Sequence, residues 1–159
     1  MTTQTPPQPA LPPSQLPEGF KLAAFEGGVS FIGVNGPLYR KREGDRMVLG
    51  MRVEKRHCNP ARICHGGMLM TFVDMSMVLA ANYQEKLGRF LPTISLSTDF
   101  LSPAPEGVWI EGRTDILRLT RTMVFAQCLV TAEGKNIVRA SGVFKLGPEM
   151  SRPDDAKGA

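Results

Sequence analysis

One ionisable residue interrupts a long uncharged stretch in the middle of this chain. Residues 68–81 read MLMTFVDMSMVLAA, and Asp74 is the only ionisable residue among them. A helix that is apolar on every side is normally a buried helix, so the pattern predicts one from about Gly67 to Lys86. An unpaired carboxylate is costly to bury, so Asp74 is expected to have a partner or a chemical role.

Two glycines precede this helix, in the sequence His65-Gly66-Gly67. The N-terminus of a helix presents unpaired N–H groups and a partial positive charge. Together, the two features suggest a helix start that binds an oxyanion and a buried carboxylate, and a hydrolase needs both. For either feature alone, an ordinary glycine loop and a paired or solvated acid remain the alternative.

Composition limits the other classes of function. A chain of 159 residues fits one domain, and its net charge of +4 is compatible with an anionic ligand. The longest basic run is Arg40-Lys41-Arg42, which we interpret as a solvated turn, so nucleic-acid binding is not indicated. No segment approaches the ~20 apolar residues of a membrane span, and the N-terminus lacks the pattern of a signal peptide. We therefore expect a cytoplasmic protein that binds neither nucleic acid nor membranes.

The cysteines and histidines do not form a recognisable metal motif. Cys58, Cys64 and Cys128 are an odd number without a secretion signal, which favours reduced thiols. His57 and His65 each adjoin a cysteine, but adjacent residues lack the spacing that lets two side chains converge on zinc. We expect no metal site.

Domain boundaries follow from the proline-rich and polar ends. Residues 1–17 contain six prolines and are expected to be a disordered tail, residues 18–147 the folded domain, and residues 148–159 a polar C-terminal tail. A short helix or turn is expected through Ala24, and residues 57–64 are expected to form an irregular loop. Alternating apolar residues and turn signals predict strands at 29–34, 47–53, 94–100, 108–119, 123–131 and 137–146.

The order of elements predicts an α+β fold in which four antiparallel strands follow the helix as a meander. A single flat sheet cannot cover every side of one helix. A sheet curved around the helix, with a second subunit behind it, can do so. This is the hot-dog architecture, with the long helix at its centre, and it implies a dimer or a larger assembly.

Residues 59–67 read NPARICHGG, and Asp74 follows nine residues after His65. This segment resembles the N-x-x-G-x-x-H-G-G-x₆-D motif of the PaaI-like hot-dog acyl-CoA thioesterases. The resemblance extends over about Phe20 to Leu146, including Ser102-Pro103-Ala104. Arg62 stands where the motif has glycine, a residue often used where φ is positive.

The resemblance implies hydrolysis of an acyl-CoA to a free acid and CoA, and the chemistry can be followed from the residues. The N–H of Gly66 or Gly67 can polarise the thioester carbonyl. Asp74 can act as general base on water or as nucleophile, and the sequence leaves both open. No cofactor is expected, because coenzyme A is part of the substrate.

Further roles are carried over only by the resemblance. It implies that Asn59 approaches the carboxylate and the attacking water, that His65 orients the loop, and that Thr93 holds water. Arg121 and Thr122 would lie near the CoA phosphates, and Arg62 is expected to influence binding of the acyl group. Each of these residues also has a purely structural interpretation, as a turn, loop or strand residue.

Helix geometry adds a constraint that does not depend on the family. Asp74 lies seven or eight residues beyond the two glycines, or about 11–12 Å along the axis. One chain therefore cannot bring both to one carbonyl, whereas two antiparallel helices can. We expect a homodimer with two shared sites, possibly paired into a tetramer. Two alternatives remain: a non-catalytic acyl-CoA-binding or sensor protein, and a hot-dog hydratase that uses a histidine.

Overall fold

The computed structural model describes residue 12 and residues 15–23 and 30–150. In chain order the elements are β1 (Lys21–Leu22), α1 (Phe31–Asn35), β2 (Tyr39–Glu43), β3 (Arg46–Arg52), the 3-10 turn η2 (Lys55–His57), α2 (Gly66–Gln84), β4 (Thr93–Phe100), β5 (Trp109–Leu119), β6 (Met123–Ala132) and β7 (Lys135–Lys145).

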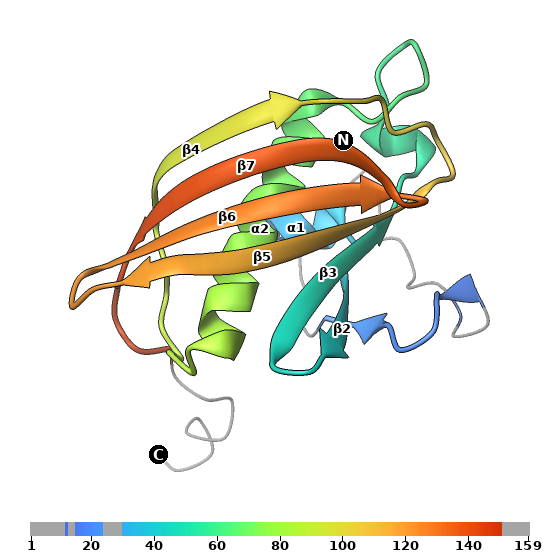
Figure 1. The fold of residues 1–159 in the computed structure, drawn as a ribbon. Coiled ribbons are helices and arrows are strands. Elements are labelled where there is room, and N and C mark those ends of the chain that lie inside the picture. Colours follow the sequence, from blue (N-terminus) through green and yellow to red (C-terminus); the bar gives the residue numbers. More distant parts are fainter. Residues whose placement is uncertain (1–11, 13–14, 24–29, 151–159) are drawn as a thin grey trace, which may run out of the picture.

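The strands form one antiparallel sheet that curves across one side of α2 (Figure 1). Its order is β1-β2-β3-β5-β6-β7-β4, so β5, β6 and β7 form the expected meander. The position expected for β4 is wrong: β4 pairs with β7 at the edge of the sheet and does not adjoin β5. An α+β hot-dog arrangement of one long helix against a curved sheet is confirmed.

Helix α2 is confirmed within two residues at each end, and a single chain buries only one of its sides. The side facing the sheet is buried, and includes Phe72, Val73 and Met77 with no exposed surface. Gly112 of β5 permits this contact, because a Cβ there would lie 2.5 Å from the Ser76 hydroxyl oxygen. The opposite side, called here the open face, is exposed or half-buried, and it consists of Gly67, Met70, Thr71, Asp74, Met75 and Val78.

The prediction of a strand at residues 29–34 is wrong for residues 30–34, which the structure describes. Helix α1 begins after Ser30, whose hydroxyl oxygen accepts a hydrogen bond of 3.0 Å from the Gly33 N–H. This is an ordinary N-cap, and it outweighs the β-branched residues that suggested a strand.

The basic run at residues 40–42 was predicted to be a solvated turn, and this is wrong. These residues form the centre of β2. The Lys41 ammonium group lies 2.9 Å from Glu43 and 4.9 Å from the centre of the Phe20 ring, so its charge is paired within the fold. The helix or turn expected through Ala24 is also wrong in part: Lys21–Leu22 is a strand, and Ala24 lies outside the described residues.

The predicted tails, residues 1–17 and 148–159, lie largely outside the described residues. The described start of the C-terminal segment is paired with the chain, because the Phe90 N–H donates to Pro148 and the Met150 N–H donates to Gly88. Among the helices of the described part, none has the length and hydrophobicity needed to cross a membrane.

Candidate active site

A short hairpin leads into α2, where a loop was expected. Cys58 and Cys64 form an antiparallel bridge, and the Asn59 N–H donates to the Ile63 carbonyl at 2.9 Å. The Asn59 Oδ1 accepts from the N–H groups of Ala61 and Ile63, at 3.0 and 3.4 Å. Asn59 thus fixes the shape of the hairpin with its oxygen, while its amide nitrogen has no partner among the described residues.

Arg62 occupies the left-handed position of this hairpin, with φ of 59°. This is the position at which the motif has glycine, so the backbone retains the conformation that glycine favours despite the substitution. The Arg62 guanidinium group donates two hydrogen bonds to one Glu106 oxygen, at 3.0 and 3.1 Å. The side chain is therefore directed toward Glu106, although 77% of its surface remains exposed.

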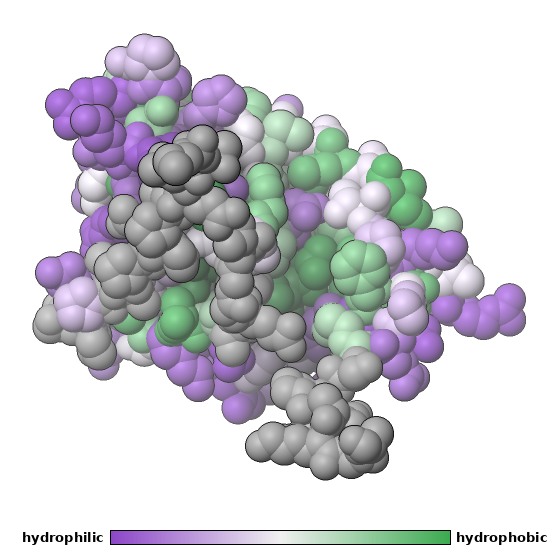
Figure 2. Space-filling model, turned by 180° about the vertical axis from the view of Figure 1, so that it is seen from behind, coloured by the Kyte–Doolittle hydropathy of each residue, from purple (hydrophilic) through white to green (hydrophobic). Residues whose placement is uncertain are grey.

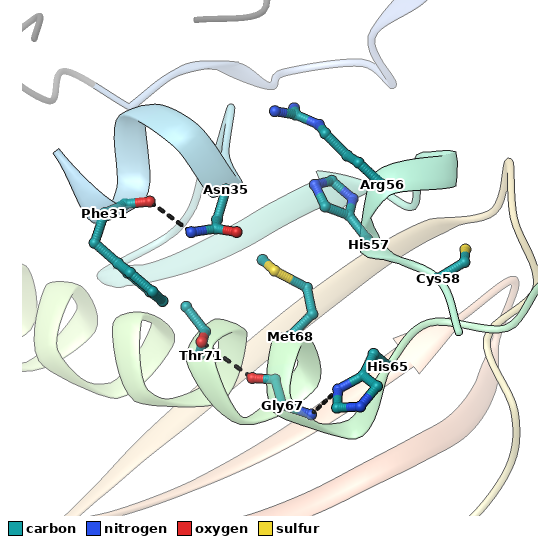
Figure 3. A pocket seen from close by; sticks show the side chains of 9 residues that line it. All are labelled: Phe31, Asn35, Arg56, His57, Cys58, His65, Gly67, Met68 and Thr71. Atoms are coloured by element: carbon teal, nitrogen blue, oxygen red, sulfur yellow. Dashed lines mark hydrogen bonds between the residues drawn. The ribbon is translucent and has the colours of Figure 1, made fainter. Parts of the chain in front are cut away.

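The first turn of α2 is capped by His65. Its Nδ1 accepts from the Gly67 N–H at 2.9 Å, and its carbonyl accepts from the N–H groups of Met68 and Leu69 (Figure 3). The Gly66 N–H donates to no acceptor within the described residues. Of the two donors proposed from the sequence, Gly66 is thus the one available to a ligand in this conformation.

Gly66 also allows close contact with the end of β4. A Cβ at this position would lie 3.2 Å from the Phe100 ring. A cavity of about 490 Å³ adjoins the contact, and its lining residues are Asn59, Ile63, Cys64, Gly66, Leu69, Phe100, Leu101, Ser102, Pro103 and Ala104. The free N–H of the helix therefore lies beside a mostly apolar cavity.

Asp74 and Thr93 are brought together on the open face. The Thr93 hydroxyl donates to Asp74 Oδ1 at 2.6 Å, and this is a charge-assisted hydrogen bond. The expectation that Asp74 is buried is wrong in a single chain, because the residue is half-buried. A carboxylate that is oriented and still accessible can act on a molecule that reaches the open face.

The predicted residues thus form two separate groups. Asn59, His65, Gly66 and Gly67 lie at the helix start, and Asp74 with Thr93 lies about 12 Å further along the axis. The Arg121–Thr122 turn joins β5 to β6, and the Leu146 N–H donates to the Thr122 carbonyl at 2.8 Å. This turn lies at the far end of β5 and β6, away from the helix start (Figure 1).

The sequence analysis did not predict that His57 is buried beside a cavity. Only 3% of its surface is exposed, and its Nδ1 accepts from the Glu54 N–H at 3.0 Å. The neutral ring therefore carries its proton on Nε2, which has no hydrogen-bond partner. Burial, chiefly, lowers the pKa of His57 below its usual value.

The His57 ring faces a second cavity, of about 520 Å³, between α1 and α2 (Figure 3). Arg56 holds α1 over this space by donating to the carbonyls of Val34 and Gly36. The lining residues are Phe31, Asn35, Arg56, His57, Cys58, His65, Gly67, Met68 and Thr71. In the part of the chain that the structure describes, no group of three or more His, Cys, Asp or Glu residues could hold a metal ion.

Comparison with known proteins agrees with this geometry. Residues 61–138 match the family model of the thioesterase superfamily. A putative esterase of Pseudomonas aeruginosa is 30% identical over 132 residues, which cover 82% of this chain and 97% of that protein. The chain belongs to the thioesterase superfamily. The relatives place it among the ester and thioester hydrolases.

Two further similarities extend this result. Acyl-coenzyme A thioesterase 13 of Mus musculus is 29% identical over 105 residues, covering 65% of this chain and 74% of that protein. The phenylacetic acid degradation protein PaaI of Thermus thermophilus has the same fold. It superposes with a TM-score of 0.64 at 23% identity, covering 73% of this chain and 97% of that one. The hot-dog fold of the PaaI-like thioesterases is thus confirmed.

Proposed function

We propose that this protein hydrolyses acyl-CoA thioesters at two identical sites, each built from both subunits of a homodimer. The observation that carries the proposal is the separation of the two polar groups along α2. A free backbone donor lies at Gly66, and an oriented, accessible carboxylate lies at Asp74, about 12 Å away on the same helix. Antiparallel packing of two such helices would bring the donor of each to the carboxylate of the other.

The surface around the open face supports this assembly. Met70 is 40% exposed, and Phe31, Ile94 and Phe100 are each more than half exposed. Hydrophobic side chains gather on the side of the molecule that is turned away in Figure 1 (Figure 2). Strand β4 is an edge strand, so its outer backbone groups are available to a second copy of the chain.

Hydrolysis would proceed with the thioester carbonyl oxygen on the Gly66 N–H. Asp74 of the other subunit takes a proton from water, which adds to the carbonyl carbon, or Asp74 itself adds to that carbon. Thr93 keeps the carboxylate oriented in either case. Collapse of the tetrahedral intermediate breaks the C–S bond. On the general-base route, the departing CoA sulfur takes the proton that Asp74 removed from water. On the nucleophilic route, the collapse leaves an anhydride of Asp74, which water then cleaves to the free acid, restoring the carboxylate and supplying the proton for the CoA sulfur. The Gly66 N–H stabilises the charge that develops on the oxygen.

The remaining residues have supporting roles in this proposal. Asn59 holds the hairpin and offers its amide N–H groups to water or substrate, and His65 caps the helix. In an antiparallel pair, Arg121 and Thr122 of one subunit would approach the helix start of the other, where CoA phosphates could bind them. Arg62 would contact the substrate only after leaving Glu106. The chemistry needs no cofactor or metal, since CoA arrives as part of the substrate.

The decisive test compares two substitutions at Gly66. Gly66→Pro removes the N–H at the first helical position, where proline is well tolerated, while Gly66→Ala keeps the N–H and adds the Cβ that both residues share. Loss of one oxyanion donor costs about 10²–10³ in kcat. We therefore expect thiol release from acyl-CoAs to fall by this factor in Gly66→Pro relative to Gly66→Ala. Equal rates in two folded variants would contradict the role of this N–H.

The shared site has its own test. Homodimers of Gly66→Pro and of Asp74→Asn should both be nearly inactive. Unfolding and refolding an equal mixture should restore up to about a quarter of wild-type activity, because half the dimers are mixed and each has one intact site of two. Each variant alone must stay inactive after the same treatment. Mixed dimers without activity would show that the site is not shared.

An acyl-CoA panel separates the two alternatives. A sensor would bind acyl-CoA without releasing CoA. A hydratase would change the absorbance of an enoyl-CoA and leave its thioester intact. Hydrolysis of any acyl-CoA in the panel that is lost in Asp74→Asn excludes both alternatives for this site.

A further inference from the structure

Cys58 and Cys64 are opposite one another across the hairpin that precedes α2. The hydrogen bonds on either side of the pair run from Asn59 N–H to Ile63 and from His65 N–H to His57, at 2.9 and 2.8 Å. This pattern makes the two cysteines a non-hydrogen-bonded pair of an antiparallel bridge. In such pairs the Cα atoms are about 4.5 Å apart and the side chains point to the same face.

This spacing lies within the range of Cα separations found in disulfides, about 4.4–6.8 Å. Cys64 is buried in the main hydrophobic core, and the half-buried Cys58 packs against the same core. Both thiols are free in the structure. The third thiol, Cys128, is buried in the middle of β6, opposite Thr114 and Ala140. Cys58 and Cys64 are therefore close enough to form a disulfide, and Cys128, which has no cysteine opposite it, serves as a control.

We propose that Cys58 and Cys64 are a modification site, at which a peroxide forms an intrachain disulfide across the hairpin. Cys58 reacts first because it is the more exposed of the two. Its sulfur displaces water from hydrogen peroxide and becomes a sulfenic acid. The Cys64 sulfur then attacks the Cys58 sulfur, the S–S bond forms, and a second water leaves. The two thiols lose two electrons and two protons in total, and one peroxide is reduced to two waters.

The environment makes this reaction slow at neutral pH and faster in alkali. Burial raises the pKa of the Cys64 thiol to about 12, and it also raises the pKa of Cys58 above its usual value. The thiolate is the reactive form, so the rate should rise about tenfold per pH unit in this range. The proximity of the pair determines which sulfurs become bonded, while the fraction of thiolate determines how quickly.

The disulfide would act on the hairpin that holds Asn59 and Arg62. It would add a covalent link between the two hairpin strands, in register with their existing hydrogen bonds. The proposal does not depend on the function proposed above, because its readout is a covalent bond. Its failure would leave the thioesterase proposal unaffected, and the reverse also holds.

Peptide mapping tests the pairing directly. The full-length protein is treated with hydrogen peroxide at pH 7 and pH 9, denatured, alkylated and digested with trypsin. Cleavage after Arg62 separates the two cysteines into peptides 57–62 and 63–86. We expect these peptides to be joined, with the titratable thiols of the denatured chain falling from three to one and returning with dithiothreitol.

Substitutions provide the controls. Cys58→Ser, at the half-buried position, should abolish the joined peptide, and Cys128→Ser should leave its yield and its pH dependence unchanged. Cys64→Ser should also abolish the joined peptide if it folds. Disulfides between chains, irreversible oxidation of Cys58 beside a free Cys64, or a rate that does not rise with pH would each overturn the proposal.

Discussion

The two sides of helix α2 are similar in composition and opposite in environment. Phe72, Val73 and Met77 face the sheet and are fully buried. Met70 and Met75, on the open face, are as hydrophobic as residues of the core but retain exposed surface within one chain. A sequence that is apolar on every side of a helix predicts burial of each side. It does not distinguish a side covered by the sheet of the same chain from a side that a second subunit would cover.

The difference also separates stability from chemistry. Among the buried residues of α2, Ser76 is the one with a polar side chain, and its hydroxyl donates to the Phe72 carbonyl within the helix. The open face carries Asp74, whose carboxylate is oriented by a residue of another element, Thr93. Substitutions on the two sides should therefore affect different properties.

The largest effect is expected on the sheet-facing side. Phe72→Ala should lower the free energy of unfolding by about 3–5 kcal/mol, because it removes a fully buried aromatic ring. Met75→Ala is the matched control on the open face, and it should mainly weaken association of the subunits. Urea denaturation and sedimentation equilibrium measure the two properties. Equal losses of stability at both positions would contradict the comparison.

Asp74 provides the complementary case, in which activity changes and stability does not. Asp74→Asn preserves the shape of the side chain and removes its basicity, so hydrolysis of acyl-CoA should fall by ~10² or more. Thr93→Val should reduce the rate less, because the carboxylate remains but loses its orienting hydrogen bond. Steady-state kinetics and a melting curve for each variant test this. An active Asp74→Asn protein would refute the mechanism.

The hairpin beside the open face should respond to removal of backbone strain. Arg62 has a positive φ, which costs a residue with a side chain about 1 kcal/mol. Arg62→Gly should therefore raise the free energy of unfolding by about that amount, despite losing the contact with Glu106. Glu106→Gln is the control that removes the ion pair and keeps the strain. Because both variants lack the ion pair, an Arg62→Gly protein no more stable than Glu106→Gln would contradict the strain at this position.

The buried His57 predicts a pH dependence of stability. Its pKa in the folded protein is lowered from 6.5, so the unfolded chain binds a proton more readily. The contribution of the neutral ring is thus fully present above pH 6.5 and is lost as the pH falls below it. His57→Asn should flatten this part of the stability curve. Denaturation at pH 5.5 and 7.5 measures the difference.

The sequence was sufficient for features that depend on local patterns. The apolar run from Met68 to Ala81 determines α2, and the turn residues Glu133-Gly134 separate β6 from β7. The spacing from Asn59 to Asp74 identified a helix start and a carboxylate on one segment, although the loop expected before the helix is a short hairpin.

Other features depend on contacts that local patterns do not contain. The basic residues of β2 are accommodated in a strand because Lys41 meets Glu43 and the Phe20 ring. Helix α1 is five residues long and depends on one cap at Ser30 and on Arg56 from another segment. The burial of His57 likewise results from elements that approach it from both sides. Sequence periodicity carries no information on any of these contacts.

The pairing of β4 has a consequence for how the protein is made. In the described part of the chain, β7 is the one sheet neighbour of strand β4, and Thr93 lies opposite Phe144, near the end of the folded chain. During synthesis α2 can form early, but Thr93 cannot be fixed beside Asp74 until β7 has left the ribosome. A nascent or truncated chain that lacks β7 would have the helix and the carboxylate without the orienting hydroxyl. Completion of the carboxylate site would then be among the last events of folding.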